Sequence, residues 1–103
     1  MSRKYENFSA FYPDYLAEHR NPICKLLHFI GSSMVLLALA GVMHQGRWGY
    51  LWLLPLIGYG FAWVGHFVFE KNRPATFRHP FYSLMGDWVM FIDILRGRVR
   101  IWS

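Results

Sequence analysis

Two long apolar segments, at residues 26–43 and 50–69, constrain the fold of this chain more than any other feature. They contain 18 and 20 residues, and neither includes an Asp, Glu, Lys or Arg. An α-helix needs about 20 apolar residues to cross a hydrocarbon core about 30 Å thick. The link between the segments, residues 44–49, is short and contains two glycines, and short links place neighbouring helices antiparallel. The sequence therefore predicts a membrane-spanning helical hairpin.

The composition fits a small all-α membrane bundle. Apolar residues make up 54% of the chain and charged residues only 17%, whereas soluble domains carry about 25% charged residues. A chain of 103 residues has room for one domain, so we expect residues 1–103 to form a single membrane-embedded unit. We expect amphipathic helices on both sides of the hairpin, at the membrane interface or packed against the spans. Their apolar residues recur at helical spacing at Phe8, Phe11, Tyr12, Tyr15 and Leu16, with Ser9 as the cap, and at Leu84, Trp88, Phe91, Ile92 and Leu95.

The basic residues orient the hairpin. Of the 11 Lys and Arg residues, only Arg47 lies in the link between the apolar segments. The other ten flank the hairpin, and by the positive-inside rule both termini are then cytoplasmic. Basic flanks of this kind also bind the anionic headgroups of membrane lipids. No known nucleic-acid-binding motif accompanies the net charge of +5, so we expect no nucleic-acid partner, while a homo-oligomer stays open.

Histidines in or beside the apolar segments are candidate functional groups, because an ionisable group inside a membrane is costly and usually serves a site. His66 and Glu70 lie one helical turn apart in the second segment. His28 lies near the same end of the first segment, and His19 is separated from it by only a tight turn. The four groups can therefore converge at one depth and hold a metal ion.

These residues also have ordinary structural interpretations. A histidine such as His19 is favoured near a helix C-terminus by the helix dipole, and His28 can hydrogen-bond across helices. His44 and His79 are interpreted as loop residues. Cys24 is the only cysteine, which excludes an internal disulfide and, we expect, a cysteine-based metal site.

The chain contains the strings YLAEHRN at 15–21, LHFIG at 27–31, WVGHFVFEKNRPA at 63–75, PFYS at 80–83, and Gly86-Asp87. These strings resemble the iron-dependent 2-hydroxy fatty acid dioxygenase family, which was long catalogued as a domain of unknown function. The resemblance implies fatty acid α-oxidation, in which ferrous iron and dioxygen shorten a 2-hydroxy fatty acid by one carbon. It also implies that His19, His28 and His66 hold the iron. This chain is much shorter between its spans than the eukaryotic members, which act in the endoplasmic reticulum. We expect an integral membrane protein, of a bacterial inner membrane.

The residues suggest how such an enzyme would work. Neutral imidazoles are good ligands for Fe²⁺, and an incomplete protein shell leaves positions for dioxygen and for a substrate that chelates through its hydroxyl and a carboxylate oxygen. Glu70 is the candidate catalytic residue, either as a direct ligand or as a partner of one. Asp87 is expected to orient a ligating imidazole. The substrate-binding candidates are Tyr59 and Trp63 for the acyl tail, and Lys71 and Arg73 for the remaining negative charge.

Two alternatives to the dioxygenase remain at this level. The first is a haem-binding electron carrier in which His28 and His66 are axial ligands across the hairpin. The second is a non-catalytic membrane scaffold whose histidines only pack and hydrogen-bond. Bound iron without a haem absorption band would favour the dioxygenase, and the absence of any bound metal would favour the scaffold.

Overall fold

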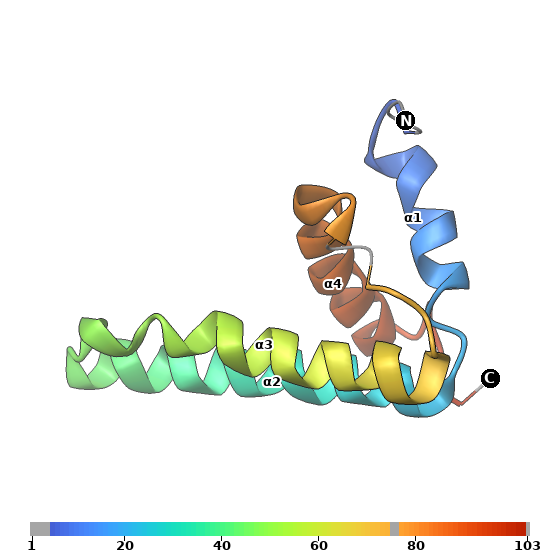
Figure 1. The fold of residues 1–103 in the computed structure, drawn as a ribbon. Helices are drawn as coiled ribbons and strands as arrows, with labels where there is room; N and C mark the ends of the chain where they lie inside the picture. The colour runs from blue at the N-terminus through green and yellow to red at the C-terminus, as the bar shows by residue number, and fades with distance from the viewer. Residues whose placement is uncertain (1–4, 75–76, 103) are drawn as a thin grey trace.

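In the computed structural model, which describes residues 5–74 and 77–102, the regular structure is helical throughout (Figure 1). The all-α prediction is therefore confirmed. In chain order the elements are α1 (Phe8–Ala17), α2 (Pro22–Gln45), the 3-10 turn η1 (Trp48–Tyr50), α3 (Leu53–Val64), the π-helix η2 (Gly65–Glu70) and α4 (Pro80–Leu95).

α2 and α3 form the predicted hairpin and run side by side over their whole length (Figure 1). The side chain of Asn21 caps the start of α2 by accepting a hydrogen bond from the Ile23 N–H at 2.8 Å, and Pro22 occupies the first turn. Gly46 ends α2 in the left-handed conformation, with φ of 66°, which a residue without Cβ adopts easily. The chain then returns through a helical stretch from Trp48 to Glu70.

Both arms of the hairpin are long and apolar enough to cross a membrane. Pro22–Gln45 has 24 residues and Trp48–Glu70 has 23, so each extends a few residues beyond the predicted segment. Their large apolar side chains are mostly uncovered, as Leu37 with 69% and Leu56 with 60% of its surface exposed illustrate. An apolar surface this extensive is typical of a membrane or protein contact, since soluble monomers rarely expose one.

α1 and α4 pack against each other and rise steeply from one end of the hairpin (Figure 1). Phe11 and Tyr15 of α1 and Met90 of α4 form the buried core of this pair. Two tyrosine–aspartate hydrogen bonds join the same helices: the Tyr12 hydroxyl donates to Asp93 at 2.8 Å, and the Tyr15 hydroxyl donates to the carboxylate of Asp87. The α1–α4 pair thus brings the end of α1 to the hairpin.

One local prediction for these outer helices is wrong. α1 is capped by Asn7, whose side chain accepts from the Ala10 N–H at 2.9 Å, and the predicted cap Ser9 lies inside the helix. In α4 the predicted apolar stripe is divided: Phe91 is buried, whereas Leu84, Ile92 and Leu95 are 46%, 47% and 63% exposed. The buried residues of α4 are Ser83, Gly86, Met90 and Phe91. Gly86 faces α1 without a side chain because the ring of Tyr15 fills the space between the helices.

Candidate metal centre

Three histidines meet where the end of α1, α2 and the π-helix η2 come together: His19 follows α1, His28 lies in α2 and His66 lies in η2. His19, His28 and His66 are all buried, with 1%, 5% and 2% of their surfaces exposed. Their ring centroids are 4.4 to 5.0 Å apart, and each pair of rings is close to perpendicular. The structure thus brings together the three histidines that the sequence analysis selected.

Local packing places each ring. His19 follows the end of α1, where its ring stacks on Tyr15 with centroids 4.1 Å apart. His66 lies in the π-helix, a wide helical turn that is found frequently at functional sites. Gly65 allows this turn to approach α2 closely, because a Cβ at position 65 would lie 2.9 Å from the Cys24 Sγ. The residue before His66 therefore has no room for a side chain.

Hydrogen bonds fix which nitrogen of each imidazole carries the proton. The Nδ1 of His19 lies 2.6 Å from the carbonyl oxygen of Tyr15, and the Nδ1 of His28 lies 2.9 Å from that of Cys24. A carbonyl oxygen only accepts hydrogen bonds, so each Nδ1 must donate. The neutral ring then has a lone pair on Nε2, which is the form that binds a metal.

The side chain of Asn72 fixes the position of the proton on the His66 ring. Its side-chain oxygen lies 2.8 Å from the His66 Nδ1. Its side-chain nitrogen donates to the Glu18 carbonyl at 3.2 Å, which fixes the orientation of the amide. All three Nδ1 atoms are therefore occupied by acceptors, and all three Nε2 atoms remain for a metal ion.

The resulting arrangement fits a cation. The Nε2 atoms of His19 and His28 lie 3.1 Å apart, yet neither carries a hydrogen when both Nδ1 atoms donate. Two facing lone pairs at this distance repel each other unless a positive charge lies near both. Burial, together with the neighbouring imidazoles His28 and His66, lowers the pKa of His19, so that this ring is neutral at pH 7. A neutral imidazole is ready to act as a ligand.

The expectation that Cys24 takes no part in a metal site needs correction. Its buried thiol belongs to the same group, in which one ligand atom from each of His19, Cys24, His28 and His66 lies within 4.8 Å of the others. Sγ lies 3.7 Å from the Nδ1 of His28. A single cysteine cannot form a site alone, but one thiol can complete a set of three imidazoles.

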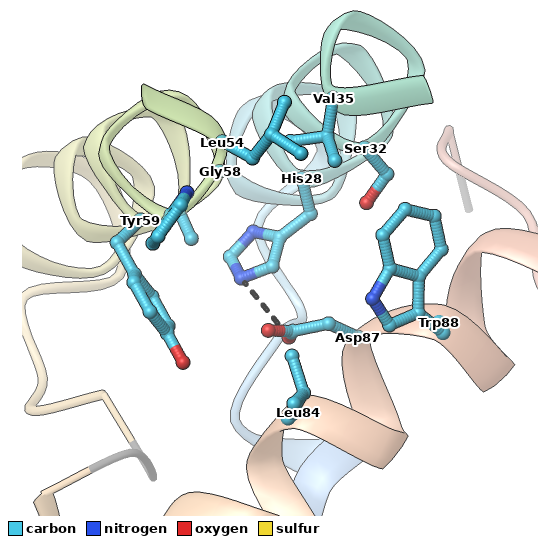
Figure 2. Close-up of a pocket in the computed structure, with 11 residues that line it drawn as sticks. His28, Ser32, Val35, Leu54, Gly58, Tyr59, Leu84, Asp87 and Trp88 are labelled. Carbon is cyan, nitrogen blue, oxygen red and sulfur yellow. Dashed lines mark ion pairs between the residues drawn. The ribbon is translucent and has the colours of Figure 1, made fainter. Parts of the chain in front are cut away.

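Asp87 of α4 lies at the edge of the cluster, where its Oδ1 is 4.0 Å from the Nε2 of His28 (Figure 2). The sequence analysis expected Asp87 to orient an imidazole, which requires contact with the ring nitrogen that faces away from the metal. In His28 that nitrogen, Nδ1, is held by the Cys24 carbonyl, and Asp87 faces the other side. Burial raises the pKa of Asp87 to about 7, although the hydrogen bond from Tyr15 opposes this shift.

Glu70 ends the π-helix and is not one of the four clustered groups. Its Oε2 accepts a hydrogen bond from the Asn21 N–H at 2.5 Å. The carboxylate therefore joins the end of the second span to the start of the first, beside the histidines. The catalytic role expected for Glu70 stays a prediction.

A cavity of about 300 Å³ opens from the cluster between α2, α3 and α4 (Figure 2). His28 and Asp87 form its polar end, and apolar side chains form most of the remainder. The residues that line it are His28, Ser32, Val35, Leu54, Pro55, Gly58, Tyr59, Ala62, Leu84, Asp87 and Trp88. The cavity is thus a groove with one polar end and an apolar body.

The predicted substrate-binding residues divide into two groups. Tyr59 lines the groove, whereas Trp63 packs outside it, against Tyr59 and Phe77 with ring centroids 5.6 and 5.3 Å away. Lys71 and Arg73 are exposed in the segment after the π-helix. A role for Trp63, Lys71 and Arg73 in substrate binding stays a prediction.

Sequence reasoning missed two residues that hold the cluster. Asn72 orients His66, and Tyr15 holds His19 through its carbonyl and its ring. Both lie within the strings that resemble the dioxygenase family, and Tyr15 precedes His19 by one helical turn. The one-turn spacing from His19 could have indicated that Tyr15 contacts this histidine. Asn72 lies in a loop, where no periodic pattern indicates its contact with His66.

Comparison with known proteins gives one match. A family described as 2-hydroxy-palmitic acid dioxygenase Mpo1-like matches residues 5–99. This range includes all the clustered groups and the residues that line the groove. Searches of curated proteins and of solved structures return no match.

Proposed function

The chain belongs to the Mpo1-like family, and on that basis we propose that it is a membrane-embedded dioxygenase that shortens a 2-hydroxy fatty acid by one carbon. The overall reaction balances as R–CH(OH)–COOH + O₂ → R–COOH + CO₂ + H₂O. The carboxyl carbon leaves as carbon dioxide, and the carbon that carried the hydroxyl becomes the new carboxyl group.

The observation that carries this proposal is the set of three Nε2 lone pairs. His19, His28 and His66 would hold Fe²⁺, a metal that imidazole ligands suit, and the Cys24 thiol is available as a fourth donor. Ferrous iron, when bound, supplies the electrons that allow dioxygen to react with an organic substrate. The carbonyls and the amide behind the rings hold the three Nδ1 hydrogens and leave the three Nε2 lone pairs for a metal ion, so the site is prepared before iron arrives.

The surroundings of the cluster fit a substrate with a polar head and an apolar tail. The head would lie beside His28 and Asp87, and the tail would extend into the groove. Asp87 is the carboxylate placed to receive a proton from the substrate head, and the Tyr15 hydroxyl supports its charged form. The buried position of the histidines excludes bulk water from the reacting groups.

The same geometry argues against the haem alternative. The ring centroids of His28 and His66 are 5.0 Å apart, and His19 packs against both rings. Three rings this close leave no planar gap for a macrocycle between two axial ligands. A single ion fits the space better.

We also propose that the hairpin spans a membrane, as in a bacterial inner membrane, with residues 1–103 forming one domain. The uncovered apolar side chains of both spans support this, because lipid is the solvent they would prefer. Two of the flanking basic residues, Arg3 and Lys4, lie outside the described residues. The remaining eight flank the end of the hairpin that carries the histidines, and by the positive-inside rule this supports a site at the cytoplasmic side.

The test is a reaction with purified components. The detergent-purified protein, loaded with Fe²⁺ and supplied with dioxygen, should convert 2-hydroxypalmitic acid to the acid one carbon shorter and release carbon dioxide. Palmitic acid, which lacks the hydroxyl, is the matched control and should not be shortened. If iron is bound but no 2-hydroxy acid is shortened, the proposed activity is wrong and a metal protein of another function remains.

A further inference from the structure

The groove beside the metal centre follows the axis of the hairpin. On α2 it starts at His28 and continues past Ser32 to Val35, one helical turn at a time. On α3 it runs in the opposite chain direction from Ala62 to Leu54. Eight residues separate these two, so the groove is about 12 Å long, less than half of a hydrocarbon core of about 30 Å.

The chemistry of the groove selects one kind of occupant. Its only ionisable groups besides the Tyr59 hydroxyl are His28 and Asp87 at one end, and Val35, Pro55 and Leu54 form the far end. A polar head held at His28 with an unbranched hydrocarbon tail matches this distribution. The groove is also continuous with the candidate metal centre, so we assign it to the acyl tail of the substrate under the proposed function.

Gly58 is the glycine among the residues that line this groove. A Cβ at position 58 would lie 3.4 Å from Cγ2 of Val35 on the facing helix, which is an ordinary contact. Any larger side chain would extend into the space between α2 and α3. Gly58 lies four residues from Ala62, so such a side chain would block the groove about 6 Å from its polar end.

We propose that Gly58 is a specificity-determining residue: its lack of a side chain admits long acyl tails, and a large residue in its place restricts the enzyme to short 2-hydroxy acids. The proposal rests on the proposed function for the nature of the substrate. The binding of a hydrocarbon tail depends on the groove alone. Tail binding and the dioxygenase reaction can therefore be tested separately.

Gly60 provides a matched control. It lies in the same helix two residues further on, it does not line the groove, and an added Cβ would meet nothing within 4 Å. Gly58→Leu and Gly60→Leu therefore make the same chemical change inside and outside the groove. Iron content and helicity measured for both variants show whether the fold is kept. If Gly58→Leu fails to fold, Gly58→Ala replaces it: its Cβ is accommodated at 3.4 Å, and the smaller side chain should shift selectivity towards short acids in the same direction but by less.

Two measurements test the proposal. In turnover, Gly58→Leu should lower kcat/KM for 2-hydroxypalmitic acid by about 10-fold or more while leaving that for 2-hydroxyhexanoic acid nearly unchanged, and Gly60→Leu should change neither. The binding measurement uses a palmitic acid that is brominated in mid-chain, and its reporter is the fluorescence of Trp88, which lines the groove. The brominated acid should quench this fluorescence in the original protein and in Gly60→Leu, but not in Gly58→Leu. A Trp88→Phe variant identifies the quenched residue.

The outcomes separate the two proposals. Quenching that is lost only in Gly58→Leu, without turnover of any acid, keeps the groove as a tail site and rejects the dioxygenase activity. Equal selectivity and equal quenching in Gly58→Leu and Gly60→Leu overturn the role of Gly58, even if the enzyme shortens 2-hydroxy acids.

Discussion

At the scale of single residues, the candidate site depends on what lies behind each imidazole. Two backbone carbonyls and one side-chain amide accept hydrogen bonds from the three Nδ1 atoms, so the lone pair of each neutral ring is on Nε2. The three histidines could be selected from the sequence because they lie in or beside the apolar segments. Cys24 and Asn72 could not be selected, because a buried cysteine looks like an ordinary core residue and the amide acts from an irregular loop.

The first prediction concerns the ligands. His19→Ala, His28→Ala and His66→Ala should each lose most of the bound iron, because removing one imidazole from so small a set removes much of its affinity. His44→Ala is the control and should retain it: contrary to the loop interpretation, His44 lies in the last turn of α2, at the opposite end of the hairpin. Iron content of the purified variants is the measurement. A variant that binds iron as well as the original protein removes its histidine from the site, and iron loss in Cys24→Ser would add the thiol to it.

The second prediction concerns Asn72. Asn72→Leu should weaken iron binding by about 10–100-fold, because the His66 ring loses the acceptor that holds its Nδ1 hydrogen. Asn72→Asp keeps an acceptor for this hydrogen but loses the donor to the Glu18 carbonyl, so it should bind iron more tightly than Asn72→Leu. Titration of the metal-free protein with Fe²⁺ under anaerobic conditions measures both affinities. Equal affinities for the leucine and aspartate variants would show that the hydrogen bond does not support the site.

At the scale of elements, the hairpin was predictable and the packing around it was not. Length and the absence of charge identify a span without knowledge of its neighbours, and Asn21-Pro22 and Gly46 mark the ends of α2 by local chemistry. The buried face of α4 depends on which helix it meets. Because α1 contributes large aromatic rings, α4 turns Gly86 rather than Leu84 towards the protein, which hydrophobic periodicity alone cannot indicate.

The third prediction tests how the α1–α4 pair supports the site. A Cβ at position 86 would lie 2.9 Å from ring atoms of Tyr15, whose side chain is fully buried. Gly86→Ala should therefore destabilise the protein by about 1–3 kcal/mol through overpacking. It should also reduce bound iron, because Tyr15 holds His19 by its ring and its carbonyl.

The control for this change is Gly41→Ala, in α2, where an added Cβ meets nothing within 4 Å. Alanine is the better helix former, so this variant should be at least as stable as the original protein. Thermal unfolding in detergent and iron content are measured for both. If Gly86→Ala matches Gly41→Ala in stability and iron, the α1–α4 contact does not position the metal centre.

At the scale of the whole molecule, the hairpin and the α1–α4 pair meet at one end, and the candidate site lies there (Figure 1). The hairpin brings His28 and His66 together at one end, and the α1–α4 pair adds His19 and Asp87 to the same end. Convergence of the histidines could be predicted because antiparallel spans place residues near their outer ends side by side. Their hydrogen bonds and the groove could not, because both arise from contacts between segments far apart in the sequence.

The last prediction is the orientation of the protein in the membrane. Reporter fusions after Ser103, which lies outside the described residues, and within residues 45–49 should report opposite sides, with the C-terminal fusion in the cytoplasm. The reason is electrostatic: ten of the 11 Lys and Arg residues flank the hairpin, and only Arg47 lies in the turn. Opposite sides with the turn in the cytoplasm would keep the hairpin but place the metal centre on the outer face. Two fusions on the same side would mean that the spans do not cross, and the apolar side chains of α2 and α3 would then need a protein partner to cover them.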